Sequence, residues 1–178
     1  MRLILILGLI CSFNAYGQND SCILIRYPNY KTVIYQSNYT FKGETKKDLH
    51  YAYQVPYGKS GDCKPWTPTT EQVKKLESNM EPLIENYIVH GQLDSAQIMD
   101  LGYIIQNITN YNRRYFSCLD KHGTKIIYIM FDERNEDDNL DFAETELFQS
   151  MGGGTGHFSL TYNFDSKKLV DLFINAPW

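Results

Sequence analysis

Residues 157–164 alternate strictly between large apolar and small polar side chains, and this pattern constrains the fold more than any other part of the chain. The apolar positions are Phe158, Leu160, Tyr162 and Phe164, and the polar positions between them are Ser159, Thr161 and Asn163. Successive side chains of a β-strand point to opposite faces, so we expect one face of this strand to be buried and the other to be polar. The turn-forming segment 165–168 then predicts an antiparallel return strand over 169–175.

Two earlier segments are also strand-like. Residues 113–119 and 125–131 are rich in aromatic and apolar side chains, and the four residues Asp120 to Gly123 between them suit a hairpin connection. We therefore expect these two strands to pair antiparallel.

Helical signals precede these strands. Thr67 is expected to cap a helix that has Pro68 at its first position, and the apolar residues after it recur mostly at spacings of three and four. Pro82 lies inside this pattern and is expected to kink or interrupt the helix, because proline cannot donate a backbone hydrogen bond. Gly91 is expected to end the helix, and Asp94 to cap a second, shorter one.

This order of elements predicts an α+β domain in which helices pack on one curved antiparallel sheet of about four C-terminal strands. Residues 18–66 are expected to form an irregular, tyrosine-rich N-terminal region with short strands near 22–27 and 31–36, and residues 67–178 to form the helices and the sheet. Without its first 17 residues the 178-residue chain has 161, which suits a single domain over 18–178.

The first seventeen residues have the composition of a secretory signal peptide. A basic residue precedes the apolar run 3–10, and small residues within 15–17 provide a cleavage site. The run is shorter than the ~20 apolar residues that a membrane-spanning helix needs. We therefore expect a mature protein that begins at Gln18, is periplasmic or secreted, and has no stable membrane insertion. Lipidation at Cys11 is the alternative, although a bulky residue precedes that cysteine where a small one is usual.

Charge and tyrosine content narrow the class of partner. Once Arg2, one of 17 basic residues, leaves with the signal peptide, 21 acidic residues face 16 basic ones and the formal net charge moves from −4 to −5. Such a surface repels phosphate backbones, so no nucleic-acid partner is expected. The 14 tyrosines suit either a recognition face or structural packing at half-buried strand positions, and composition favours packing.

Three cysteines follow the signal peptide, and an oxidising compartment permits disulfides. We expect Cys22 to pair with Cys63, which would tie the N-terminal region to the start of the first helix, and Cys118 to remain a buried thiol in an apolar strand. Asn38 and Asn107 begin acceptor patterns for glycosylation, which matter only in a eukaryotic source.

Few residues suggest chemistry, and each has a structural alternative. His157 borders a run of glycines and is the best single candidate for acid–base work, while the alternative is a half-exposed histidine at a strand end. Arg113 and Arg114 point to opposite faces of their strand, so only one can enter a sheet concavity, where an arginine suits an anionic ligand. Together with Arg114 and His157, Gly153 and Gly154 are the candidates for ligand binding.

Two further patterns resemble known binding loops but depart from them. The glycine run 152–156 lacks the Gly-Lys-Ser/Thr ending of a phosphate loop and leads into a strand, so a flexible turn is expected. The acidic run 132–141 matches part of the spacing of a calcium loop, with Asn135 at the first position and Glu146 at the twelfth, but Leu140 stands where the tight turn needs glycine. We therefore expect a solvated acidic loop, no metal and no cofactor.

Several of these segments together resemble a recurrent group of small exported bacterial proteins of unknown function. The resemblance runs from about Trp66 to Asn175 and is carried by Trp66-Thr67-Pro68-Thr69, Arg113-Arg114-Tyr115-Phe116, Lys125-Ile126-Ile127-Tyr128-Ile129, Gly152-Gly153-Gly154 and the hairpin 158–175. It implies a compartment and a fold, similar to cystatin-like folds including the nuclear-transport-factor-like cone, and it assigns no catalytic residues. Where such proteins often close the last strand with Asn-Gly, this chain has Asn175-Ala176-Pro177.

The leading hypothesis is an exported, soluble, non-enzymatic protein that binds a protein or small molecule of unknown identity. It rests on the lack of a recognised catalytic motif and on the abundant tyrosine. One alternative is a small hydrolase-like enzyme with His157 as its acid or base. Another is an immunity or inhibitor protein whose acidic surface faces a basic target.

Overall fold

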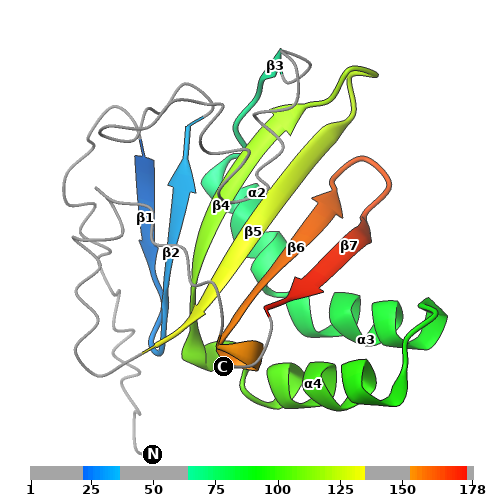
Figure 1. The fold of residues 1–178 in the computed structure, drawn as a ribbon. Helices are drawn as coiled ribbons and strands as arrows, with labels where there is room; N and C mark the ends of the chain where they lie inside the picture. The colour runs from blue at the N-terminus through cyan, green and yellow to red at the C-terminus, as the bar shows by residue number, and fades with distance from the viewer. Residues whose placement is uncertain (1–21, 37–63, 135–152, 176–178) are drawn as a thin grey trace, which may run out of the picture.

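The computed structural model describes residues 22–36, 64–134 and 153–175, which form a seven-stranded sheet and three α-helices (Figure 1). The strands are β1 (Cys22–Arg26), β2 (Lys31–Tyr35), β3 (Lys64–Pro65), β4 (Tyr111–Leu119), β5 (Lys125–Glu133), β6 (His157–Asn163) and β7 (Lys168–Ile174). The helices are α2 (Thr70–Glu77), α3 (Met80–His90) and α4 (Ser95–Gln106). The predicted α+β class is confirmed. No helix among these residues is long and apolar enough to cross a membrane.

The strands follow the order β1-β2-β4-β5-β6-β7, and β3 pairs separately with β4. Every pairing is antiparallel except that of β2 with β4, which is parallel and places Thr32 opposite Arg113. The expectation of about four strands is therefore wrong, because the N-terminal region adds three strands to the C-terminal four. Alternation within a strand predicts its two faces, but it does not identify a partner strand far away in the sequence.

The N-terminal region is more ordered than predicted at its start. The two short strands expected near 22–27 and 31–36 are β1 and β2, joined as an antiparallel hairpin. Residues 37–63, which the sequence predicted to be irregular, lie outside the described residues, as do the predicted signal peptide and both Cys11 and Asn38.

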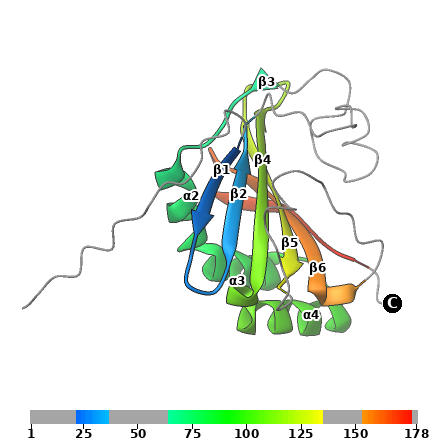
Figure 2. The ribbon, with the colours of Figure 1, turned by 90° about the vertical axis from the view of Figure 1, so that its left-hand side faces the viewer.

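The hydrophobic core lies between the helices and one face of the sheet. Helix α2 lies behind β4 and β5 in the view of Figure 1, and α3 and α4 lie side by side beyond β7; Figure 2 shows the same layers from the side of β1. The helices contribute Val73, Leu76, Met80, Ile84, Leu101 and Ile104 to this core. Burying apolar surface of this kind provides the main driving force for folding.

Strand β6 confirms the alternation read from the sequence. Phe158, Leu160 and Tyr162 are buried in the core, on the sheet face that the helices cover. The rings of Phe158 and Phe131 stack with their centroids 4.2 Å apart, and Tyr111 packs edge-on to Phe158 at 5.1 Å. The aromatic side chains of three neighbouring strands thus fill one part of the core.

The first helix begins two residues later than predicted. Its cap is Thr69 rather than Thr67: the Thr69 hydroxyl accepts the backbone N–H of Gln72, and the Gln72 side chain accepts the backbone N–H of Thr69. This reciprocal capping box satisfies two backbone donors at once, which the threonine two residues earlier has no glutamine or glutamate to match. The sequence analysis overlooked Thr69 as the cap.

The predicted interruption at Pro82 lies a few residues before the proline itself. The chain breaks between α2 and α3 at Ser78 and Asn79, and Pro82 is the third residue of α3, where the first turn does not need its backbone donor. The predicted ends are confirmed further on, because Gly91 is the C-cap of α3 and Asp94 is the N-cap of α4.

The cysteines do not follow the predicted pairing of Cys22 with Cys63. Cys22 is a buried thiol on β1, and Cys118, buried on β4, is in a disulfide instead of being the free thiol that was expected. Cys63 itself lies outside those residues. Strand β3 runs along β4 with Pro65 opposite Cys118, a pairing that sequence spacing alone does not reveal.

Candidate functional site

Asp132 brings together the two side chains that the sequence singled out, Arg114 and His157. The three residues come from the neighbouring strands β4, β5 and β6, and Asp132 is the register partner of His157. His157 Nδ1 lies 3.1 Å from Asp132 Oδ1, and Arg114 Nη1 donates to the other oxygen, Oδ2, in an ion pair. We call these three residues the Arg–Asp–His cluster. It lies on the sheet face opposite the hydrophobic core, because each member is out of step with the core residues of its strand.

The glycine run before β6 places His157 in this cluster. Gly153 and Gly154 have φ values of 99° and 53°, in the left-handed region that glycine adopts readily, and the short 3-10 turn Gly154–Gly156 leads directly into β6. The Tyr111 hydroxyl donates to the carbonyl oxygen of Thr155 at 3.0 Å and fixes the turn to β4. The turn therefore positions the His157 side chain. It also lacks the following helix that a phosphate loop requires, as the sequence predicted.

The Arg–Asp–His cluster is only partly open to solvent. The side chains of Arg114, Asp132 and His157 are 10%, 16% and 25% exposed. Both oxygens of Asp132 are engaged, one by each partner, and Arg114 Nε is buried and has no hydrogen-bond partner among the described residues. Chemically, Asp132 holds the imidazole through Nδ1 and leaves Nε2 for another group, while the Arg114 charge offsets part of the negative charge that Asp132 presents.

Arg113 points to the opposite face and is enclosed in the core. Its Nε lies 3.1 Å from Glu77 Oε2, and both side chains are only 2% exposed. Its two terminal nitrogens donate to the carbonyl oxygens of Tyr111 and Ile108 at 2.6 Å, and its guanidinium lies 3.5 Å from the centre of the Tyr30 ring. The prediction that the two arginines face opposite ways is confirmed, and each has a carboxylate partner.

Glu77 is the centre of a buried polar network that the sequence analysis missed. Its Oε1 accepts the hydroxyls of Tyr115 at 2.8 Å and Thr32 at 3.0 Å, in addition to the Arg113 ion pair. Burial first, and then the Glu77 charge, raise the pKa of the Tyr115 phenol well above its usual range, so Tyr115 remains a hydrogen-bond donor. The available signal was the position of Glu77, four residues after Val73 in the apolar stripe of the helix.

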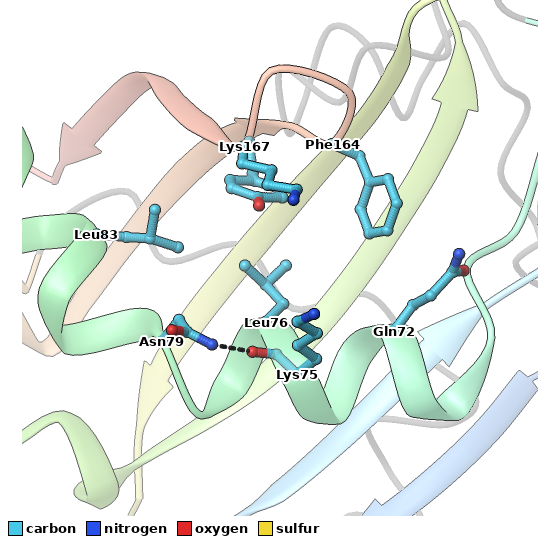
Figure 3. Close-up of a pocket in the computed structure, with 8 residues that line it drawn as sticks. Gln72, Lys75, Leu76, Asn79, Leu83, Phe164 and Lys167 are labelled. Atoms are coloured by element: carbon cyan, nitrogen blue, oxygen red, sulfur yellow. Dashed lines mark hydrogen bonds between the residues drawn. The ribbon is translucent and has the colours of Figure 1, made fainter.

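A pocket of about 300 Å³ lies at a different place, between the helices and the β6–β7 turn. We call it the helix–turn pocket, and Figure 3 shows it in close-up. Leu76 of α2, Leu83 of α3, Tyr162 of β6 and Phe164 just beyond β6 form its apolar part. The polar lining residues are Gln72, Lys75, Asn79 and Lys167. In the figure, Phe164 and Lys167 face α2 across the gap, and Asn79 Nδ2 donates to the Lys75 carbonyl oxygen at 2.6 Å.

The sequence did not predict this pocket, because its walls come from segments about 90 residues apart that only tertiary packing brings together. Lys167, which the sequence places in the turn-forming segment 165–168, is one of its lining residues. Among the described residues no group of histidine, cysteine and carboxylate side chains has the arrangement of a metal site. Most of the acidic run 132–141, Asn135 included, lies outside those residues, and so does Glu146.

No protein-family model, curated protein or solved structure matches this chain. The Arg–Asp–His cluster and the helix–turn pocket are therefore the structural observations that bear on function.

Proposed function

We propose that this protein is an exported, non-enzymatic binding protein that holds a small organic molecule in the helix–turn pocket. The observation that carries the proposal is the pocket itself, whose apolar lining residues are buried or half-buried and whose two lysines are exposed. Small-molecule sites are typically concave, mostly apolar and about 300–1,000 Å³ in volume, with a few polar groups that orient the ligand. The pocket lies at the lower end of this range, which suits a compact ligand.

The construction of the pocket supports binding to a preformed site. Its walls belong to α2, α3 and β6, and Leu76 and Tyr162 are themselves buried members of the core. The Phe164 ring packs against that of Trp66, with the two ring centroids 5.4 Å apart. Walls fixed by core packing lose little conformational entropy when a ligand binds, so more of the contact energy appears as affinity.

Export is the part of the proposal that rests on sequence alone. Residues 1–17 have the basic start, apolar run and small residues of a signal peptide. N-terminal sequencing of the protein from a secreting host is expected to begin at Gln18 or its cyclised form. A mature chain that retains residues 1–17, or that carries lipid at Cys11, would contradict this part of the proposal.

A neutral apolar fluorophore, N-phenyl-1-naphthylamine, provides the direct test of binding. We expect saturable fluorescence enhancement with the parent protein. Leu83→Trp places a larger side chain in the pocket and should weaken that binding, whereas Val89→Trp, also on α3 but at a position 74% exposed and outside the pocket, should not. Equal binding by both variants, with folds unchanged by circular dichroism, would show that the pocket is not the site.

The second candidate is a small hydrolase-like enzyme, and one observation favours it. The 3.1 Å contact between Asp132 Oδ1 and His157 Nδ1 resembles the way a carboxylate orients a catalytic imidazole. Two observations count against it. Arg114 binds the same carboxylate, and the hydrogen-bond partner of the His157 ring among the described residues is Asp132 and not a nucleophilic side chain. A nucleophilic side chain in contact with the imidazole is what this arrangement would need in order to favour catalysis.

The two candidates differ in turnover. We expect no activity in a screen of esterase, peptidase and glycosidase substrates at neutral pH. Activity that disappears in His157→Ala but persists in His122→Ala, a change in the exposed β4–β5 turn, would replace the binding proposal with the enzymatic one. Removal of an essential base typically lowers the rate by roughly 10²–10⁴-fold, so the assay would detect such a loss easily.

A further inference from the structure

We propose that the helix–turn pocket selects an amphipathic anion, a small molecule with an apolar body and one negatively charged head group. This inference rests on the proposed binding function and names its ligand class. Two features of the pocket carry it: its apolar lining residues are buried or half-buried whereas its charged ones are exposed, and its charge is of one sign.

All the charge on the lining of the pocket is positive. Lys75 comes from α2 and Lys167 from the β6–β7 turn, and none of the eight lining residues is acidic. Neither lysine takes part in an ion pair with the described residues. The protein as a whole carries a formal charge of −4, so this local positive pair is opposite in sign to the chain that surrounds it. Two ammonium groups at the edge of an apolar pocket complement an anionic head group.

The β6–β7 turn holds Lys167 in place. Lys167 has φ of 56°, the left-handed region that a lysine adopts rarely. Two side-chain contacts fix the turn around it: Asn163 Oδ1 accepts the backbone N–H of Ser166 at 2.9 Å, and Asp165 Oδ2 accepts the backbone N–H of Lys125 at 2.9 Å. In Figure 3 this places Lys167 across the gap from Lys75, with Leu76 and Phe164 between their two elements.

A third lysine, Lys125, contacts two aromatic rings near the pocket. The Lys125 ammonium lies 5.8 Å from the Trp66 ring centre and 6.0 Å from that of Phe164, so its charge is directed at the aromatic wall. Burial raises the pKa of the Tyr162 phenol, which keeps that hydroxyl protonated as a donor at the pocket. The pocket thus offers two cations and a hydroxyl donor to a head group, and apolar side chains to the body.

The experiment compares an anionic probe, 8-anilinonaphthalene-1-sulfonate, with the neutral N-phenyl-1-naphthylamine. The chain supplies its own control, because each pocket lysine has a lysine neighbour outside the pocket. The test variant is K75Q/K167N, in which asparagine suits the left-handed position, and the control is K74Q/K168Q, which changes the net charge equally. Circular dichroism and thermal melts establish that both variants are folded.

We expect the test variant to bind the sulfonate about fivefold more weakly than the parent, as the loss of two partly screened ion pairs implies, and the neutral probe within about twofold. The control variant should match the parent with both probes. Raising the salt concentration should weaken binding of the sulfonate alone.

Two outcomes would overturn the inference and they are distinguishable. If both variants weaken sulfonate binding equally, or if neither does while the neutral probe still binds, the pocket exists as a binding site but does not select anions. If Leu83→Trp leaves both probes bound as in the parent, the proposed binding function fails together with this inference.

Discussion

Replacement of Glu77 by glutamine should destabilise the fold strongly, although the two side chains have almost the same shape. Glu77 and Arg113 form an ion pair at 3.1 Å, and both side chains are 2% exposed. The amide keeps one oxygen for the hydroxyls of Tyr115 and Thr32 but leaves the buried Arg113 charge without a counter-charge. The perturbation therefore isolates charge from volume.

The magnitude follows from the burial of this pair. Removal of one partner of a buried salt bridge typically costs about 3–5 kcal/mol, and the almost complete burial of both groups leaves little solvent to screen the remaining charge. For a domain of this size, about 1 kcal/mol corresponds to a change of about 2–4 °C in Tm. We therefore expect Glu77→Gln to lower Tm by about 6–20 °C.

Urea and thermal unfolding, followed by circular dichroism, measure the effect. Glu85→Gln, a change at an exposed position of α3, is the matched control and should stay within about 0.5 kcal/mol of the parent. The double variant E77Q/R113M removes both charges and should be more stable than E77Q alone, because no buried charge is left unpaired. A loss below about 1 kcal/mol for E77Q, or a double variant as unstable as the sum of the two single changes, would refute this reasoning.

Three further predictions concern the core, the cysteines and alkaline stability. Leu160→Ala should destabilise the protein by about 2–5 kcal/mol in urea unfolding, because it truncates a buried side chain of β6, and an effect near zero would mean that the core face of β6 is misassigned. Non-reducing peptide mapping should link Cys118 to Cys63, since Cys22 is a thiol and Cys11 lies in the predicted signal peptide; a peptide joining Cys22 to either would contradict this. Burial raises the Tyr115 pKa in the folded state, so the folded protein retains a proton that the unfolded chain releases, and the free energy of unfolding should fall as pH rises above about 10. Unfolding by urea at pH 8 and pH 11 checks the sign, and equal stability at the two pH values would contradict it.

The elements that could be predicted from sequence are those that local patterns determine. The alternation around Leu160 gave the correct faces of β6, and the segment Asp120 to Gly123 gave the correct hairpin between β4 and β5. Helix ends at Gly91 and Asp94 were correct for the same reason, because capping depends on neighbouring residues. Local patterns carry no information on which distant strands pair, and the sheet is accordingly larger than predicted.

In the candidate site, too, local patterns predicted some residues and missed those whose role depends on distant partners. Arg114 and His157 were proposed from the face and the position of each, and the structure places both against Asp132. Asp132 was noticed only as the first residue of an acidic run, because its role depends on its register opposite His157. Glu77 was overlooked although it interrupts an apolar stripe, and a charged residue in such a stripe indicates a buried partner elsewhere in the chain.

The parallel pairing of β2 with β4 has a consequence for the order in which the chain folds. Thr32 and Arg113 are register partners 81 positions apart, so the β1–β2 hairpin is synthesised long before the strand that it joins. An isolated two-stranded hairpin is marginally stable at best, whereas β4, β5, β6 and β7 pair with their neighbours in sequence. The C-terminal meander is thus the part that can assemble first, because long-range contacts repay their loop-closure entropy last. Until the hairpin docks, one edge of β4 is left as a template for strand addition, and that interval is when the chain is most exposed to aggregation.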